Sequence, residues 1–201
     1  IDGGNGADAI AAGNGQDKVL GGEGNDTVAG GYGDDAIYGG AGDDAIEGGG
    51  GDDLIFAGDG NDAVTATDFF GRGDDAIYGG AGNDALNGGR GADYLDGGAD
   101  ADWLNGGAGD DVMLGGAGAD SFAIRSAHGV DTILDFSAED RLMLARNMNM
   151  QGELSAADLT DRLIDLGEDA YLDLGHDNGV LFLGVDAGEL GALFESNVGF
   201  F

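Results

Sequence analysis

The chain has 201 residues, among them 45 glycines, no proline and no cysteine, a composition that fits no ordinary globular domain and excludes a disulfide framework. Its 40 Asp and Glu face only seven Lys and Arg, and the net charge of −33 excludes nucleic acid and an anionic membrane as natural partners and favours a cation. The apolar runs are shorter than the ~18 residues of a membrane span, so no membrane span is expected.

A nine-residue repeat begins at Gly3 and continues to Ala123. Its first units read GGNGADAIA, AGNGQDKVL and GGEGNDTVA, and the register resumes at Phe70 after four extra residues, 66–69. In all thirteen units the second residue is Gly, the sixth is Asp and the eighth is apolar. Such regular spacing predicts a repeat architecture in which each unit contacts its neighbours.

The period of nine predicts how the units stack. Nine residues hold a turn of six residues and a strand of three, and a strand that short must pair with others. Two units then form one coil of about 18 residues, so each unit lies over the unit two places along the chain. The expected fold is all-β, a right-handed parallel β-roll with two sheets and one inward apolar side chain per strand. We expect residues 66–69 to interrupt this stacking, and Asp100, which replaces the fourth-position glycine, to distort its turn.

The turns of this roll predict a metal site. Glycine allows backbone conformations in which carbonyl oxygens converge, and stacking places the aspartates of successive coils side by side. Because bare carboxylates at that distance repel, the turns need a hard dication with six or more oxygen ligands, and Ca²⁺ fits this description better than Mg²⁺. Pairs of stacked units would hold roughly 9 to 11 Ca²⁺ ions.

The units resemble the RTX (repeats-in-toxin) nonapeptide GGxGxDxUx over residues 3–123. The resemblance implies a calcium-dependent β-roll in a bacterial protein that the type I secretion machinery exports to the extracellular medium. It also implies that the sixth residue of each unit is a calcium ligand and that turn carbonyls complete each coordination shell. The expected ligands are Asp8, Asp17, Asp26, Asp35, Asp44, Asp53, Asp62, Asp75, Asp84, Asp93, Asp102, Asp111 and Asp120.

The two sheets are expected to differ on their outer faces. Side chains alternate along a strand, so the ninth residue points outward when the eighth points inward. Even-numbered units then place apolar and aromatic side chains on one face, where they could pack against protein, bind a polysaccharide, or simply stack as a ladder that stiffens the sheet. The residues expected on this partner-binding face are Leu20, Tyr38, Leu54, Phe56, Tyr78 and Tyr94.

After Ala123 the repeat stops, and residues 124–201 are expected to form a second domain, a mixed β/α cap on the roll domain 1–123. Residues 130–145 alternate as one or two strands. Ser155 is the expected N-cap of a helix that carries Leu159, Leu163 and Leu166 and stops at Gly167. Residues 170–185 read as a hairpin with its turn at Asn178 and Gly179.

The stretch from Asp131 to Leu144 is similar to DTIxDFxxxxDxLxL, which leads into the cap of serralysin-like secreted proteins. In those relatives the extreme C-terminus also serves as the uncleaved secretion signal, so the resemblance implies the same for the tail, residues 189–201. The alternative is that Leu190, Leu193 and Phe194 only pack the cap.

Catalysis finds no support, because the chain contains no GxSxG, no HExxH and no cysteine nucleophile. The repeat follows the first residue so closely that we expect an upstream part of the polypeptide. The predicted function is therefore a calcium-binding, calcium-folded module that aids export, folding and stability of an upstream domain. Two alternatives stay open: a polysaccharide- or cell-surface-binding adhesion module, and a non-catalytic fragment of a secreted protease or lipase.

Overall fold

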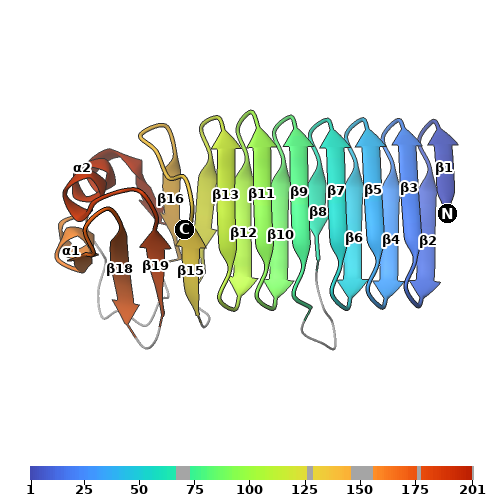
Figure 1. Ribbon diagram of the computed structural model, residues 1–201. Coiled ribbons are helices and arrows are strands. Elements are labelled where there is room, and N and C mark those ends of the chain that lie inside the picture. Colours follow the sequence, from blue (N-terminus) through green and yellow to red (C-terminus); the bar gives the residue numbers. More distant parts are fainter. Residues whose placement is uncertain (67–72, 126–128, 146–155, 176–177, 201) are drawn as a thin grey trace.

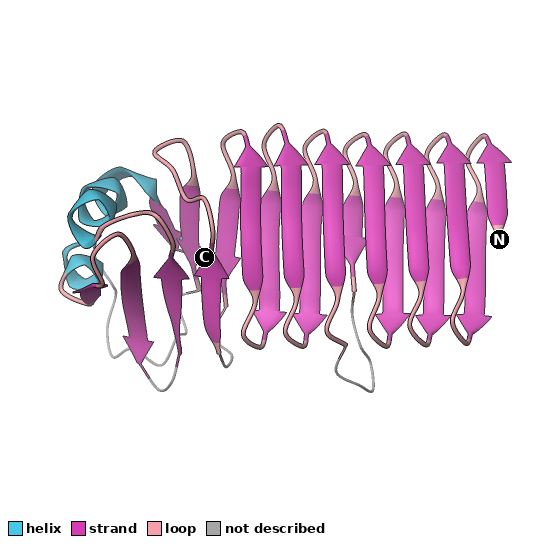
Figure 2. Cartoon of the chain, in the orientation of Figure 1, coloured by secondary structure: helices cyan, strands magenta, loops and turns pink. Residues whose placement is uncertain are grey.

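The computed structural model describes residues 1–66, 73–125, 129–145, 156–175 and 178–200. The described chain forms an elongated roll of two parallel sheets, with a helical and antiparallel cap at its C-terminal end (Figure 1). Both helices lie in the cap, as Figure 2 shows. The all-β roll with 18-residue coils and a mixed cap is confirmed.

Within the described residues the first sheet has eleven strands, and neighbouring strands in it are hydrogen-bonded. In their spatial order they are β1 (Asp2–Asn5), β3 (Lys18–Glu23), β5 (Ala36–Ala41), β7 (Leu54–Asp59), β9 (Ala76–Ala81), β11 (Tyr94–Ala99), β13 (Val112–Ala117), β15 (Val130–Ile133), β19 (Asn178–Phe182), β18 (Ala170–Gly175) and β17 (Leu163–Asp165).

The second sheet has nine strands in the described part of the chain. They are β2 (Ala9–Asn14), β4 (Thr27–Tyr32), β6 (Ala45–Gly50), β8 (Ala63–Thr65), β10 (Ala85–Arg90), β12 (Trp103–Ala108), β14 (Ser121–Ile124), β16 (Arg141–Leu144) and β20 (Val198–Phe200). The helices are α1 (Ala156–Thr160) and α2 (Ala187–Asn197). None of the described helices could span a lipid bilayer.

Most strands of the roll have six residues rather than the predicted three. A strand such as β5 contains the seventh to ninth residues of one unit and the first three of the next. The turn is therefore only three residues long, and the strands gain ladder hydrogen bonds that the shorter strand would lack. The register is that of the repeat, since Ile37 pairs with Ile55 and Gly40 with Gly58.

The core of the roll is one apolar residue deep on each sheet. The eighth residue of every unit points inward and is buried, while the ninth points outward, as the strand alternation predicts. The inward residues are Ile10, Val19, Val28, Ile37, Ile46, Ile55, Val64, Ile77, Leu86, Leu95, Leu104, Met113 and Phe122.

The prediction that residues 66–69 interrupt the stacking is wrong. Ile55 of β7 pairs with Ile77 of β9, and Val64 of β8 pairs with Leu86 of β10. Both pairs are separated by four residues more than the usual 18. The extra residues fall in the connection between β8 and β9, so they leave the strand register unchanged. Residues 67–69 lie outside the described residues.

The predicted distortion at Asp100 is also not found. Asp100 has a φ of 78°, which lies in the left-handed region that the fourth-position glycines occupy. Aspartate tolerates this region better than most residues because its short polar side chain bonds locally. The turn therefore keeps its course without the glycine.

The first strands of the cap continue the roll. β15 pairs in parallel with β13, and β16 pairs in parallel with β14. The strands predicted within residues 130–145 are thus confirmed, and the stacking of coils extends past Ala123. The end of the chain returns to the same layer, because β20 pairs with β16.

The helix predicted from Ser155 to Gly167 is mostly wrong. Ser155 lies outside the described residues, and α1 ends at Thr160. Leu163 begins β17, which pairs antiparallel with β18 through Leu163 and Leu172. The spacing of the leucines suits a helix, but the hydrogen bonds of the neighbouring strand override this local preference.

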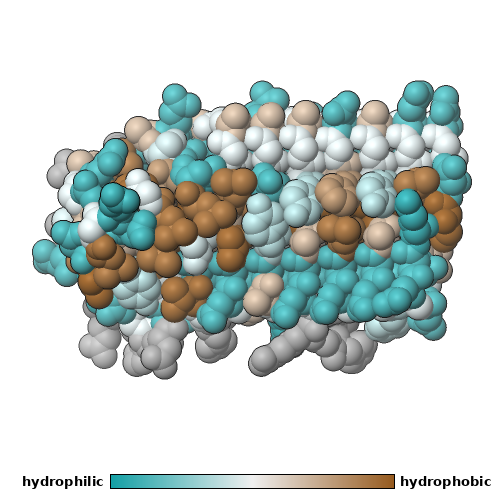
Figure 3. Space-filling view, in the orientation of Figure 1, coloured by the Kyte–Doolittle hydropathy of each residue, from teal (hydrophilic) through white to brown (hydrophobic). Residues whose placement is uncertain are grey.

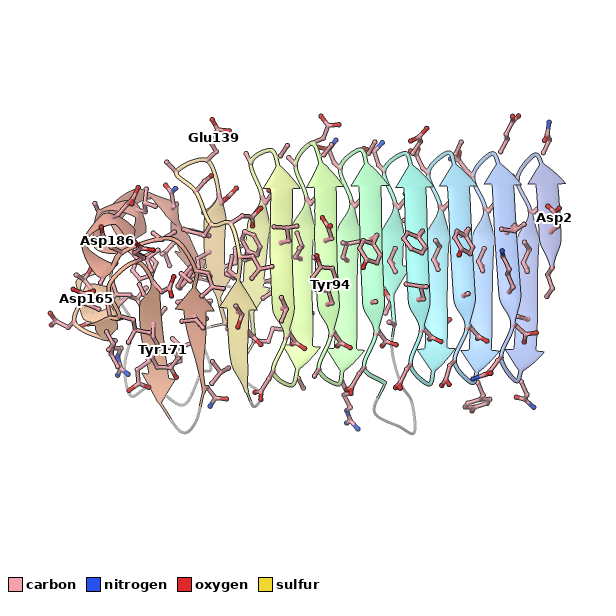
Figure 4. The ribbon with its side chains drawn as sticks, in the orientation of Figure 1. Asp2, Tyr94, Glu139, Asp165, Tyr171 and Asp186 are labelled. Carbon is pink, nitrogen blue, oxygen red and sulfur yellow. The ribbon has the colours of Figure 1, made fainter. Side chains whose placement is uncertain are left out.

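The predicted hairpin is present as β18 and β19, but Asn178 and Gly179 begin β19 instead of forming the turn. Gly179 is needed for packing, because a Cβ at this position would collide with the ring of Tyr171. Tyr171 is labelled on β18 in Figure 4. The glycine therefore allows a close approach of an aromatic ring to the backbone.

Phenylalanines join the cap to the roll. The ring centroids of Phe122 and Phe136 lie 5.9 Å apart, those of Phe136 and Phe182 5.2 Å, and those of Phe182 and Phe194 6.4 Å. Leu190 and Phe194 of α2 are buried in this cluster. These tail residues pack the cap, whatever further role the tail has.

Candidate metal centre

The sixth residues of the repeat units lie in two ladders, one at each long edge of the roll. In each ladder the backbone N–H of one aspartate donates to Oδ1 of the aspartate in the next coil: Asp26 to Asp44 at 2.8 Å, and Asp44 to Asp62 at 2.7 Å. All thirteen predicted aspartates take part. One ladder contains Asp8, Asp26, Asp44, Asp62, Asp84, Asp102 and Asp120, and the other contains Asp17, Asp35, Asp53, Asp75, Asp93 and Asp111.

The other carboxylate oxygen, Oδ2, has no hydrogen-bond donor in many of the ladder aspartates. The sixth-position aspartates from Asp26 to Asp120 are at most 3 % exposed. A buried carboxylate oxygen without a donor is costly, so each one needs an explanation. In the described part of the chain, Oδ2 is buried and accepts no hydrogen bond in Asp8, Asp26, Asp35, Asp44, Asp62, Asp84 and Asp102.

The first glycine of a unit lies directly beside this oxygen. A Cβ placed on Gly21 would collide with both Asp26 Oδ2 and the carbonyl oxygen of Gly39 in the next coil. The carboxylate oxygen and the carbonyl oxygen therefore lie on the same side of Gly21 and near each other, and both are oxygen ligands of the kind that Ca²⁺ binds. The same pair of oxygens recurs beside Gly30, Gly39, Gly79, Gly88 and Gly97.

The second and fourth residues of the unit shape the turn. Gly22 and Gly24 have φ of 122° and 114°, values that L-residues rarely adopt. The N–H of Gly24 donates to the carbonyl of Ala41 at 2.6 Å, which ties the turn to the next coil. Glycine at these positions therefore allows the positive φ angles and the close stacking of each coil on the next.

The electrostatics of the ladders favour a cation. Burial, together with the neighbouring carboxylates and against the backbone hydrogen bonds, raises the pKa of Asp62 and Asp84 to about 6 and that of Asp102 to about 7. Burial also raises the pKa of Asp35 and Asp44. Charged carboxylates inside the roll are thus unfavourable unless a positive charge lies between them.

Side chains alone do not complete a metal site. Among the described residues no group of three or more His, Cys, Asp or Glu converges in a metal-binding arrangement. A rung supplies carboxylates from two successive coils, and the other ligands would be backbone carbonyls. A donor set of carboxylate and carbonyl oxygens suits Ca²⁺ and does not suit Zn²⁺, which prefers nitrogen and sulfur.

Comparison with known proteins assigns the repeat. The RTX calcium-binding nonapeptide repeat family matches the chain at residues 1–28, 29–64, 71–95 and 87–122, more than half of its length. The chain belongs to this family. RTX repeats bind calcium, so the ladders of the RTX roll are the place where calcium chemistry is expected.

Solved structures that match the RTX chain include a secreted enzyme. The extracellular lipase LipA from Serratia marcescens aligns with 86 % of this chain at 21 % identity, with a TM-score of 0.41. The alignment covers 38 % of the lipase, so the chain spans well under half of that protein. No curated protein sequence matches the chain.

Sequence reasoning missed two members of the ladders of the RTX roll. Asp111 N–H donates to Oδ1 of Asp131 at 3.3 Å, and Asp120 N–H donates to Oδ1 of Asp140 at 2.9 Å. Each ladder thus continues one coil past the repeats. The sequence does carry a signal, an Asp followed two residues later by an apolar residue, as in Asp131 and Ile133. Asp131 follows Asp111 by 20 residues, however, whereas successive coils of the repeat are 18 residues apart, so a search at the repeat period misses it.

A further ladder on the outside of the turns was also missed. The fifth residue of many units accepts a hydrogen bond from the fifth residue of the next coil. Asn61 N–H donates to Asp43 Oδ1, and Asn83 N–H donates to Asn61 Oδ1, both at 2.9 Å. Its backbone hydrogen bonds point the other way along the chain. In this outer ladder the later coil donates to the earlier one, whereas in the inner ladder the earlier coil donates to the later one. Its signal was the frequent Asn or Asp at position five.

The six residues of the predicted partner-binding face do share one face of the first sheet. Figure 3 shows apolar patches that alternate with side chains of nearly neutral hydropathy along the middle of this face, and a row of hydrophilic side chains beside them. Tyr94 is labelled on β11 in Figure 4. Leu20 and Leu54 are each 37 % exposed, and the four aromatic residues are half-buried. Their role in partner binding stays a prediction.

The aromatic residues of this face mostly contact one another. The rings of Tyr38 and Phe56 are stacked at 5.2 Å between centroids, and those of Phe56 and Tyr78 at 4.8 Å. Lys18 Nζ lies 5.1 Å from the centroid of Tyr38 at the N-terminal end. Ring faces that are covered in this way do not stack on a sugar, which supports ladder stiffening over polysaccharide binding.

Proposed function

We propose that this chain is the calcium-folded module of a secreted bacterial protein, exported by a type I system, and that it aids export, folding and stability of an upstream domain. A single observation carries the proposal: Oδ2 of Asp26 and Asp44 is buried without a donor and lies near a backbone carbonyl oxygen of the next coil, an arrangement that recurs along the ladders. Bound calcium supplies the positive charge that these carboxylates lack.

The residues of the roll perform the other parts of this function. The aspartates of the two ladders bind the ions, and the thirteen sixth-position residues are the proposed ligands. The glycines orient the carbonyls, and the eighth-position residues close the core. Without metal, the charge of −33 and 45 glycines favour a disordered chain, so binding and folding are coupled.

The proposed site explains why folding could depend on location. Extracellular calcium modules bind with a Kd of about 10⁻⁴ to 10⁻³ M. A chain with such affinity stays unfolded where calcium is scarce and folds where calcium is abundant, outside the cell. We propose roughly 9 to 11 bound ions for the thirteen repeat units, by pairing of successive coils.

We propose no catalytic role for this module, because its buried carboxylates belong to the ladders. Whether the parent protein is a protease, a lipase or an adhesin is decided by sequence beyond this chain. The polysaccharide-binding alternative has weaker support, since the stacked rings of Tyr38, Phe56 and Tyr78 cover one another.

The proposal predicts a calcium-dependent fold. Circular dichroism of the chain in chelator should give a coil spectrum, and millimolar Ca²⁺ should restore the β-sheet signal. Mg²⁺ at the same concentration is the control and should be a poor substitute, because it keeps its waters and demands an octahedron. An unchanged β-sheet spectrum in chelator would contradict the proposal.

A further inference from the structure

The outer face of the first sheet carries one continuous row of ninth-position side chains, on the side of the molecule that Figure 3 shows. Neighbouring strands contribute one residue each, from β3 to β13. A single carboxylate interrupts this otherwise apolar and aromatic row. In the order of the strands the row contains Leu20, Tyr38, Phe56, Tyr78, Asp96 and Leu114.

Asp96, the carboxylate in this row, lacks a partner for its charge. It is half-buried, and no described residue hydrogen-bonds it or forms an ion pair with it. Burial, and after it the nearby carboxylate of Asp135, raises the pKa of Asp96. A cation brought to this position would stabilise the charged form of Asp96. The face therefore favours a partner that presents a positive charge here.

Lys18 lies at the other end of the same row. It is exposed on β3, and no described carboxylate forms an ion pair with it. Its Nζ lies over the ring of Tyr38, 5.1 Å from the centroid, so the long side chain reaches from the seventh-position column to the ninth-position row. The face thus carries a cation near one end and an unpaired carboxylate near the other.

The row is nearly symmetric about Phe56 on β7. Tyr38 and Tyr78 lie one strand to each side of it, and Lys18 and Asp96 lie two strands to each side, on β3 and β11. A two-fold axis through Phe56 and parallel to the strands would join two such faces with their strand order reversed. Lys18 of each copy then lies opposite the β11 end of the other row, where Asp96 is. Such a surface is self-complementary, as an isologous interface requires.

The stacked rings suit contact with a second protein surface. The planes of Tyr38 and Phe56 differ by 12°, and those of Phe56 and Tyr78 by 11°, so the ring faces cover one another and the ring edges remain for a partner. Leu54, 37 % exposed on the same strand as Phe56, adds apolar area near the axis. An apolar centre with charged groups at its rim is the usual anatomy of a protein interface.

The size of the face indicates a weak, reversible association. Five strands spaced about 4.8 Å apart, with six residues of about 3.3 Å each, outline roughly 500 Å² per copy, and roughly 1,000 Å² in total is at the low end for a specific interface. The net charge of −33 opposes association, but salt screens charges that lie more than about 8 Å apart at physiological ionic strength. The acidic row runs beside this face, not through its middle (Figure 3).

We propose that the outer face of the first sheet binds a second copy of this chain, in a two-fold dimer centred on Phe56 with Lys18 of each copy paired to Asp96 of the other. The proposal goes beyond calcium binding and requires only the folded roll. The two ion pairs fix the orientation of the copies, and the aromatic and leucine side chains supply the buried apolar area.

Charge reversal at the two ends of the row tests the proposal. Sedimentation of the full chain at saturating calcium, over a range of concentrations, should show a monomer–dimer equilibrium for the wild type. Asp96→Lys and Lys18→Glu should each weaken dimerisation roughly tenfold or more, because each places like charges opposite one another at both ends. Glu47→Lys is the matched control. It makes the same change of net charge as Asp96→Lys on the exposed face of the second sheet and should leave dimerisation unchanged.

A mixture of the two charge-reversed variants gives the sharpest readout. Neither variant should dimerise well alone, but the equimolar mixture should recover the wild-type dimer, because every end contact then joins opposite charges. The double variant, Lys18→Glu with Asp96→Lys, should recover it as well. All these variants keep the sixth-position aspartates, so calcium-dependent circular dichroism tests the proposed function separately.

Three results would overturn the proposal. A wild type that stays monomeric to its highest soluble concentration would leave this face to a partner of another sequence. Dimerisation that neither charge reversal weakens would place the interface elsewhere on the molecule. A mixture of the two variants that stays monomeric would show that Lys18 and Asp96 do not meet across a two-fold axis.

Discussion

The roll and the cap both bury carboxylates, but they satisfy them differently. In the roll, Asp26 and Asp44 receive one backbone donor each and keep an open buried oxygen. In the cap, Asp135 accepts the N–H groups of Gly115 and Gly116 at 2.9 and 2.7 Å. Asp186 accepts two N–H groups at the start of α2. The open carboxylate oxygens of the roll therefore favour an added cation, whereas backbone N–H groups satisfy these two cap carboxylates, from the roll for Asp135 and from the cap itself for Asp186.

The apolar cores of the roll and the cap also differ. A coil of the roll buries one aliphatic residue per strand, such as Ile46 or Ile55. The cap buries Phe136, Phe182 and Phe194 together. Because buried apolar area provides the main folding free energy, we expect the cap to be the part that is stabilised chiefly by packing.

The largest effect that separates the two regions is expected in the cap core. Phe182→Ala should lower the free energy of unfolding by about 3–5 kcal/mol, because it removes two edge-on ring contacts and leaves a cavity. Thermal unfolding at saturating calcium measures the loss, and Phe182→Leu is the conservative control. If the number of bound calcium ions in the repeats also fell sharply, the two regions would not be independent.

A smaller effect is expected from a glycine of β5 that has a positive φ. Gly40 has a φ of 119°, and a Cβ there would collide with the carbonyl oxygen of Gly22 in the preceding coil. Gly40→Ala should therefore cost about 2–4 kcal/mol, from backbone strain and overpacking together.

Gly4 provides the matched control for that prediction. Its φ of 97° is also positive, but nothing lies within 4 Å of the added Cβ. Gly4→Ala should cost about 1–2 kcal/mol from strain alone. Urea unfolding in calcium compares the two variants, and equal losses would show that contact between coils adds nothing to the strain.

The smallest effect is a response of the metal-free roll to acid. The folded-state pKa of Asp62 and Asp84 is about 6 and that of Asp102 about 7, above the ordinary 3.8. The folded chain then binds more protons than the unfolded chain between about pH 4 and pH 7, so its stability rises as pH falls through this range. In chelator, the β-sheet signal should be stronger at pH 5 than at pH 8. The opposite trend would mean that burial and the neighbouring carboxylates do not raise the pKa of these groups in the folded chain.

The architecture of the roll could be predicted from the sequence because every unit has the same pattern of residues. The eighth-position residues and the sixth-position aspartates recur in one register, so the stacking and both inner ladders could be predicted. The length of the strands could not, because it depends on hydrogen bonds between coils that one unit does not display. The effect of residues 66–69 on the stacking was predicted wrongly, because it depends on whether the extra residues fall within a strand or in the connection between two strands.

The cap was harder to predict because its contacts do not recur at a regular spacing along the chain. Leu159 and Leu163 have helical spacing, yet Leu163 pairs with β18. Gly179 looks like a turn residue, but the ring of Tyr171 requires it. Asp131 and Asp140 carry the same ladder bonds as the repeats at a spacing that the repeat does not use. Such contacts between distant segments have no periodic signal.

The direction of the inner carboxylates makes the roll a one-way stack. In Asp26 and Asp44, for example, Oδ1 accepts from the coil on the N-terminal side, and the open Oδ2 lies near a carbonyl oxygen of the coil on the C-terminal side. Loss of coils from the N-terminal end would leave each remaining Oδ2 beside the carbonyl of its following coil. Loss from the C-terminal end would expose the last of these oxygens to solvent, so the cap protects the end of the roll at which the proposed calcium sites would otherwise lie open.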